Sequence, residues 1–240
     1  MGAITPISSI NYLSQLEMKL FRVDKNQPFT GPHQGQNLYQ AGADPKNAKA
    51  AMIMIHGRGA TPQSIITLAQ EINKSNEITF FAPQAQGFTW YPFSFLMPKE
   101  QNQPGLNSGI QAVADAISKA EELGFSKDKI FILGFSQGAC LASEFVARHP
   151  DTYAGLFVFS GGLIGDALHP ELYDGDLNKT PVFMGCSDVD FHIPVERVHE
   201  SEMVLSSLNA NVTKVIYPNM GHTINQDEVD HLNNIINNRI

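Results

Sequence analysis

Short apolar runs alternate along this chain with segments whose apolar residues recur at helical spacing. The run IFIL at residues 130–133 is continuous, whereas the apolar residues at 106, 110, 113, 117 and 120 lie on one face of a helix that Gly124 ends. Such alternation predicts right-handed βαβ units. We therefore expect an α/β fold, with a mostly parallel central sheet flanked by helices on both faces.

The pattern predicts strands at residues 51–55, 78–82, 130–133, 155–159, 182–184 and 212–217, and helices at residues 62–72, 106–123, 137–149, 194–208 and 226–238. No linker rich in glycine, serine or proline separates two such blocks, so we expect one domain over residues 1–240. Residues 1–35 are polar and irregular, and we expect an N-terminal arm or an edge hairpin there. Ligands of such sheets bind beyond the carboxyl ends of the strands, so the residues that follow each strand are the candidates for a site.

Charge and composition exclude several classes of function. The 240 residues carry a formal net charge of −8, which argues against a nucleic-acid partner or an anionic membrane surface. No stretch approaches the roughly 18 uninterrupted apolar residues of a membrane span, and the N-terminus lacks the pattern of a signal peptide. Cys140 and Cys186 form neither a metal spacing nor a disulfide framework. We expect a cytoplasmic protein without stable membrane insertion.

A candidate nucleophile lies between a predicted strand and a predicted helix. Residues 134–138 read G-F-S-Q-G, which places Ser136 at a strand–turn–helix junction of the type called a nucleophile elbow. Glycines two positions away on either side remove the Cβ atoms that would clash in so tight a turn. The helix N-terminus behind the serine also favours developing negative charge. The motif therefore predicts that Ser136 is a catalytic nucleophile.

A serine hydroxyl needs a general base and a group that orients the base. His222 follows the last predicted strand, and in this architecture the chain order is serine, acid, histidine. The acid should then lie in GCSDVDFHIP, where Asp188 and Asp190 are both candidates. Asp188, Asp190 and His192 stand at alternate positions and could instead present three metal ligands. No second cluster supplies a fourth ligand, so we expect neither a metal nor a cofactor.

Two backbone N–H groups should form an oxyanion hole. One is that of Gln137, directly after the serine, and the other is that of Arg58 in the HGRGA loop. Gly57 and Gly59 allow this backbone to approach closely. The side chain of Arg58 could be a surface group or an anchor for a substrate carboxylate, and His56 should hold the loop in place.

Five segments together resemble the phospholipase/carboxylesterase family of the α/β-hydrolase superfamily, which includes bacterial carboxylesterases and acyl-protein thioesterases. They are MIHGRGAT at 54–61, APQAQGFTWYPFSF at 82–95, ILGFSQGACLA at 132–142, GCSDVDFHIPVERV at 185–198 and YPNMGH at 217–222. The resemblance implies an α/β-hydrolase fold, with Ser136 as nucleophile and His222 as base. In this family the catalytic acid is usually the aspartate of the pattern D-P-x-V-P. Residues 190–194 match with Phe191 in place of proline, which favours Asp190 over Asp188.

The resemblance also implies where substrate binds. The loop GFTWYPFSFLMP would line the acyl side of the cleft, and its candidate substrate-binding residues are Trp90, Tyr91, Phe93, Phe95 and Leu96. Residues 163–178 would form the other wall or a small lid. The resemblance further suggests a homodimer of the family type.

The sequence therefore predicts a cofactor-free serine carboxylesterase that hydrolyses small to medium carboxylic esters through a Ser136–His222–Asp190 triad and an acyl-enzyme. Alternatives are an acyl-protein thioesterase or lysophospholipase, or a non-catalytic protein that binds a small hydrophobic ligand on the same fold. A dienelactone-type hydrolase would have cysteine at the elbow, where this chain has Ser136.

Overall fold

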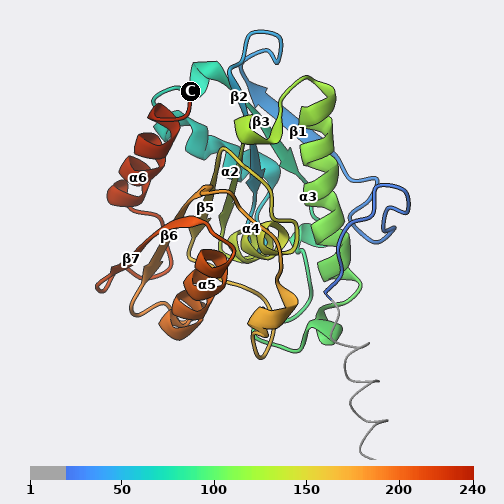
Figure 1. Ribbon diagram of the computed structural model, residues 1–240, viewed down its shortest axis with the longest axis vertical. Helices are drawn as coiled ribbons and strands as arrows, with labels where there is room; N and C mark the ends of the chain where they lie inside the picture. The colour runs from blue at the N-terminus through green and yellow to red at the C-terminus, as the bar shows by residue number, and fades with distance from the viewer. Residues whose placement is uncertain (1–19) are drawn as a thin grey trace, which may run out of the picture.

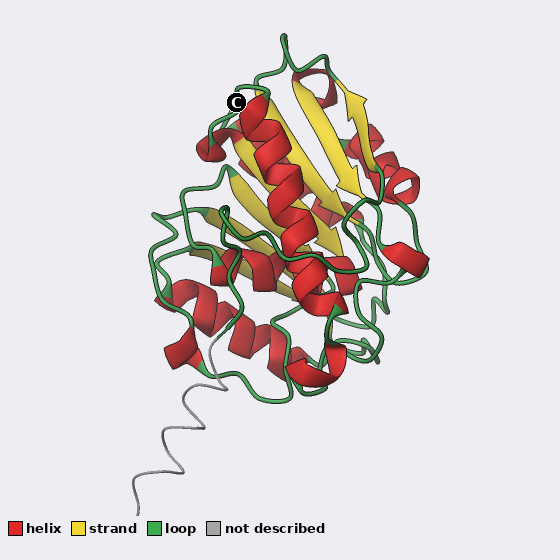
Figure 2. Cartoon of the chain, turned by 90° about the vertical axis from the view of Figure 1, so that its right-hand side faces the viewer, coloured by secondary structure: helices red, strands yellow, loops and turns green. Residues whose placement is uncertain are grey.

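A seven-stranded sheet runs through the centre of the protein in the order β1-β3-β2-β4-β5-β6-β7 (Figures 1 and 2). This computed structural model describes residues 20–240, so the part of the expected N-terminal arm at residues 1–19 lies outside the described residues. The strands are β1 (Leu38–Gly42), β2 (Ala50–Ile55), β3 (Ile78–Pro83), β4 (Ile130–Phe135), β5 (Gly155–Phe159), β6 (Pro181–Ser187) and β7 (Asn211–Tyr217). All neighbours are parallel except β1, which pairs antiparallel with β3. The predicted α/β fold with a mostly parallel sheet is confirmed.

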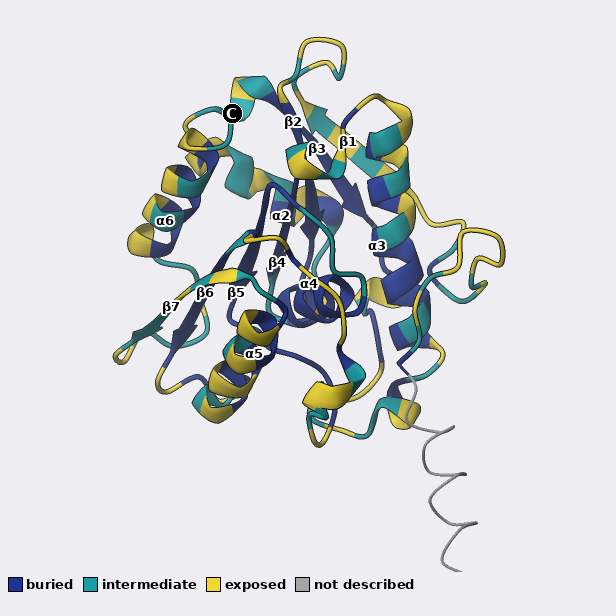
Figure 3. Ribbon diagram, in the orientation of Figure 1, coloured by how far each residue is buried: buried dark blue, intermediate teal, exposed yellow. Residues whose placement is uncertain are grey.

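Helices cover both faces of the sheet. The helices α3 (Gly105–Glu122), α4 (Gln137–Arg148) and α5 (Val195–Ser207) pack on one face, and α2 (Pro62–Ile66) and α6 (Gln226–Asn237) pack on the other. Strand side chains alternate between the two cores: on β4, Ile130 and Ile132 join the α3–α4 side, and Phe131 and Leu133 join the α2–α6 side. The inner strands are therefore buried along nearly their whole length (Figure 3).

Two elements differ from the sequence prediction. The helix expected at 62–72 is an α-helix only over Pro62–Ile66 and continues as a 3₁₀-helix over Thr67–Glu71. The edge strand β1 was not predicted. Its five residues, LYQAG, are alternately exposed and half-buried, so they lack the apolar run that marks the inner strands.

The strand order reverses at β2, and this opens a site for ligands. From β2 the chain forms β3 on one side and then crosses to form β4 on the other, with Ile55 opposite Gly134. The carboxyl ends of β2 and β4 thus flank a topological switch point, where α/β proteins bind ligands. Within residues 20–240, no helix combines the length and apolar character needed to cross a bilayer.

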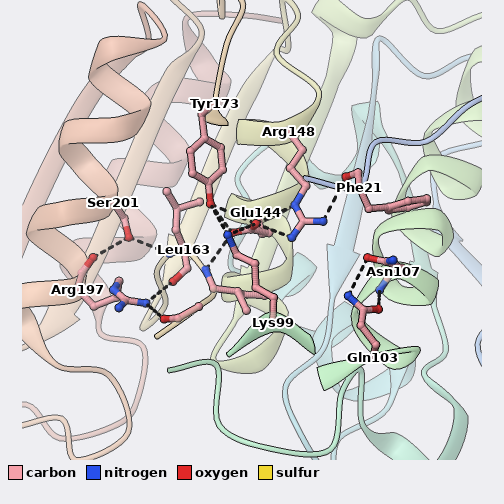
Figure 4. Close-up of polar contacts among 12 residues, drawn as sticks. Phe21, Lys99, Gln103, Asn107, Glu144, Arg148, Leu163, Tyr173, Arg197 and Ser201 are labelled. Atoms are coloured by element: carbon pink, nitrogen blue, oxygen red, sulfur yellow. Dashed lines mark hydrogen bonds and ion pairs between the residues drawn. The ribbon is translucent and has the colours of Figure 1, made fainter. Parts of the chain in front are cut away.

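A buried ionic network joins the segment at 163–173 to α4 (Figure 4). The carboxylate of Glu144 accepts hydrogen bonds from Arg148 Nε at 2.7 Å and from the backbone N–H of Ile164 at 2.9 Å, and Lys99 Nζ lies 3.9 Å away. The Tyr173 hydroxyl also contacts it at 3.2 Å. Burial by itself raises the pKa of Glu144, but the charges of Arg148 and Lys99 hold that pKa below its ordinary value.

Breaking this network should destabilise the fold. Glu144→Gln leaves the buried guanidinium of Arg148 without its carboxylate, and removing one partner of a buried pair costs about 3–5 kcal/mol. Urea unfolding measures this loss. The matched control is Glu122→Gln, which removes an exposed pair with Lys119 and should cost less than about 1 kcal/mol. Equal losses for the two variants would contradict the structural role of the network.

Candidate active site

Ser136 sits on a strained turn between β4 and α4. Its backbone has φ 56° and ψ −123°, a region that non-glycine residues rarely occupy. Its N–H donates to the Phe159 carbonyl at 2.9 Å. A Cβ at Gly134 would lie 2.3 Å from the Gly138 carbonyl oxygen, and one at Gly138 would lie 2.1 Å from that of Ile55. Both glycines are therefore required by close backbone approach, as the motif predicts.

Ser136, His222 and Asp190 form one hydrogen-bonded chain. Ser136 Oγ lies 2.8 Å from His222 Nε2, and His222 Nδ1 lies 2.6 Å from Asp190 Oδ2. Because the buried carboxylate can only accept, Nδ1 carries the proton and Nε2 is free to accept from the serine hydroxyl. The other oxygen of Asp190 accepts from the backbone N–H groups of His192 at 2.9 Å and Ile193 at 3.1 Å.

The alternative acid and the alternative metal site are not assembled. Asp188 accepts from the Asn219 N–H at 2.7 Å and does not reach the imidazole of His222. The His192 ring packs against the His222 ring, with centroids 5.0 Å apart. The three side chains considered as metal ligands are thus directed to three different contacts.

Three residues that the sequence did not single out hold the loop of His222. Ser187 Oγ accepts from the Gly221 N–H at 3.1 Å. Glu228 and Asn225 form a reciprocal capping box at the start of α6, directly after the loop. The spacing of Asn225 and Glu228 is a recognisable capping signal and could have identified this anchor, whereas nothing local marks Ser187.

The two residues predicted to supply oxyanion donors, Arg58 and Gln137, line the same cavity as Ser136. A Cβ on Gly57 would lie 3.4 Å from Ser136 Cβ, so the loop after β2 contacts the elbow. Gly59 donates to the Phe88 carbonyl at 2.7 Å, which fixes this loop. Gln137 is the first residue of α4, and its N–H has no partner within the helix. Among residues 20–240, no loop or turn carbonyl accepts a hydrogen bond from the backbone N–H of Arg58 or of Gln137.

A cavity of about 480 Å³ opens above the serine. Of the five predicted substrate-binding residues, Tyr91, Phe93 and Phe95 line it. Trp90 and Leu96 do not. Trp90 is fully buried between the rings of His33 and His56, and its Nε1 donates to the His56 carbonyl at 2.8 Å.

Two further expectations about the cleft need correction. Leu96 packs against the core on the α3–α4 side of the sheet, so its side chain is engaged there. Residues 163–178 are absent from the cavity lining, because the network around Glu144 fixes the start of this segment on α4. The lining is instead completed by His192 and Ile193 from the loop after β6.

Comparison with known proteins identifies the family. The model of the Phospholipase/Carboxylesterase family matches residues 40–240. The chain belongs to this family. The resemblance predicted from five segments is thereby confirmed, and the protein is a hydrolase of the serine hydrolase type with the esterase or thioesterase activity of its family.

Alignments with other proteins cover most of the chain of this phospholipase/carboxylesterase family member. The crystal structure of a phospholipase/carboxylesterase from Dyadobacter fermentans is 41% identical with a TM-score of 0.83, covering 86% of this chain and 99% of that chain. The mouse lysophospholipase-like protein 1 is 26% identical over 80% of this chain and 87% of its own. Acyl-protein thioesterase 1 of Neurospora crassa is 24% identical over 80% of this chain and 87% of its own length.

Side chains from distant segments fix the loop that lines the cavity. Gln137 Oε1 accepts from the Trp90 N–H at 2.9 Å, and its Nε2 donates to the Tyr91 carbonyl at 2.9 Å. His33 Nε2 donates to the Trp90 carbonyl at 2.9 Å, while its Nδ1 accepts from the Gln86 N–H at 3.0 Å. This bonding requires neutral imidazole, and burial lowers the pKa of His33 below its ordinary value.

His33 should therefore make stability depend on pH. Its folded pKa lies below the unfolded value of about 6.5, so below that pH the unfolded chain binds more protons and unfolding becomes easier. The stability it contributes is present above pH 6.5 and is lost as the pH falls toward the folded pKa. His33→Gln should flatten the slope between pH 6.5 and 5.5 by up to about 1.4 kcal/mol per pH unit. Urea unfolding followed by Trp90 fluorescence measures the slopes, and identical slopes would contradict the assignment.

Proposed function

We propose that this protein is a serine carboxylesterase that cleaves small to medium carboxylic esters through an acyl-enzyme. The observation that carries the proposal is the chain of contacts from Asp190 through His222 to the strained Ser136, at the floor of an open cavity. Each group has the partner that its role requires: the carboxylate of Asp190 faces one imidazole nitrogen of His222, and the hydroxyl of Ser136 faces the other.

Acylation begins when Ser136 Oγ attacks the ester carbonyl carbon and His222 Nε2 takes the hydroxyl proton. Asp190 stabilises the imidazolium that forms, because its carboxylate remains hydrogen-bonded to Nδ1. The N–H groups of Arg58 and Gln137 hold the developing oxyanion. The tetrahedral intermediate then breaks its bond to the alkoxy oxygen, and His222 gives its proton to the leaving alcohol.

Deacylation repeats the chemistry with water. His222 takes a proton from water as the water oxygen bonds to the acyl carbon. Collapse breaks the bond to Ser136 Oγ, which receives the proton back, and the carboxylic acid leaves. The same donors hold the second oxyanion, so no cofactor is needed for either step.

Thioesters and lysophospholipids form a second candidate substrate class within the same mechanism. This candidate is favoured by the relatives named acyl-protein thioesterase 1 and lysophospholipase-like protein 1. Long acyl chains require an extended apolar groove. The site here is a single cavity of about 480 Å³, whose apolar side chains include three phenylalanines near the serine. We therefore place short and medium esters first. A purely binding role would leave the strain at Ser136 without a purpose.

Replacing the nucleophile should abolish turnover. Ser136→Ala removes the attacking oxygen, and we expect the kcat for p-nitrophenyl butyrate at neutral pH to fall on the order of 10⁴–10⁶-fold. Ser206→Ala, on an exposed position of α5, is the matched control and should retain full activity. If both variants retain activity, the proposal is wrong.

The two aspartates of the loop after β6 offer a second, internal comparison. Asp190→Asn should lower kcat by about 10⁴-fold, because the amide would stabilise the wrong tautomer of His222. Asp188→Asn keeps an oxygen that can accept from Asn219, so we expect a loss of less than about tenfold. Steady-state kinetics of the two purified variants decide between them, and a larger loss for Asp188→Asn would reverse the assignment of the acid.

A further inference from the structure

The cavity above Ser136 has an unusual charge for this protein. The chain carries 24 acidic and 16 basic residues, yet among residues 20–240 no aspartate or glutamate lines the cavity. Its charged or titratable lining side chains other than Cys140 and Tyr91 are Arg58, His192 and His222. Asp190 lies behind the imidazole of His222 with its side chain fully buried. From the described part of the chain, a ligand in the cavity therefore meets cationic and neutral side chains.

Arg58 is held in place without being neutralised. Its Nη1 donates to the Pro92 carbonyl at 2.9 Å, and its Nη2 donates to the Phe93 carbonyl at 2.7 Å. Carbonyl oxygens orient a guanidinium but carry no net charge. Within residues 20–240, no carboxylate lies within ion-pair distance of Arg58. Three of the five N–H donors of its guanidinium remain available.

We propose that the preferred substrates are anionic esters, in which a carboxylate on the substrate pairs with the side chain of Arg58. This inference rests on the proposed esterase function and adds the chemical class of its substrate. A planar guanidinium matches a carboxylate geometrically, and a pre-oriented guanidinium loses less side-chain freedom when it binds. Arg58 also supplies an oxyanion N–H, so its side chain starts from the point where the ester carbonyl binds.

A simpler role for Arg58 would be to clamp the cavity loop. The two carbonyl contacts alone would serve that purpose and would affect neutral and anionic esters alike. A charge contact affects only the anionic ester, and it does so chiefly through KM. The exposed position of Arg58 makes the contact accessible to salt, so its contribution should fall as ionic strength rises.

Two matched pairs of esters separate these roles. Monoethyl succinate carries a carboxylate at the end of its acyl part, where ethyl 4-methylpentanoate carries an isopropyl group of similar shape. O-butyrylglycolate and isobutyl butyrate differ in the same way on the alcohol side. For one pair or both, we expect the wild type to show at least a tenfold higher kcat/KM for the anionic ester. This preference should shrink between about 0.01 M and 1 M salt.

Three variants assign the preference to the charge. Arg58→Gln should abolish it, whereas Arg58→Lys should keep part of it, because lysine keeps the positive charge but lacks the planar guanidinium and the two-carbonyl clamp. Arg239→Gln is the matched control, because Arg239 also donates to two carbonyls, those of Tyr153 and Ala154, but does not line the cavity. Its anionic preference should equal that of the wild type.

Each outcome supports or overturns the inference. An enzyme that hydrolyses p-nitrophenyl butyrate but shows no anionic preference in either pair overturns it and leaves the proposed function standing. A preference that survives in Arg58→Gln also overturns it. Failure to hydrolyse every ester, together with no reaction of Ser136 with a fluorophosphonate, removes the proposed function and this inference with it.

Discussion

The geometry of the site depends on one strained residue at the end of β4. Ser136 has a backbone conformation that costs on the order of 1–3 kcal/mol, and the surrounding sheet and helix must supply that energy. Its N–H donates to Phe159 on β5, and Gly134 and Gly138 allow the strand and the helix to meet at backbone distance. The strain holds the hydroxyl above the sheet, within reach of His222.

The rest of the fold brings two other loops to that hydroxyl. Parallel pairing aligns the carboxyl ends of β4, β6 and β7, so residues distant in sequence converge at one edge of the sheet. The loop after β6 supplies Asp190, which two backbone N–H groups hold in place, and the loop after β7 supplies His222. Because the carboxylate of Asp190 is shielded from water, its bond to the imidazole is not weakened by solvent.

Local sequence predicted the parts of the structure that depend on local physics. The inner strands are continuous apolar runs, and the elbow motif restricts backbone geometry within five residues. Asp190 could be chosen over Asp188 only through the family pattern. Trp90 is buried because it contacts His33, 57 positions away, and His56, 34 positions away. The sequence pattern within a loop does not reveal such distant contacts. The edge strand β1 was missed because its pairing with β3, rather than its composition, defines it.

The most direct test of the account is to locate the nucleophile chemically. The wild type would be incubated with a fluorophosphonate at neutral pH, digested and mapped by mass spectrometry, with His222→Ala treated in parallel. We expect one phosphonylated residue, Ser136, in the wild type, and labelling at least 100-fold slower in the variant that lacks the base. Labelling at another residue, or equal labelling rates in the two proteins, would contradict it.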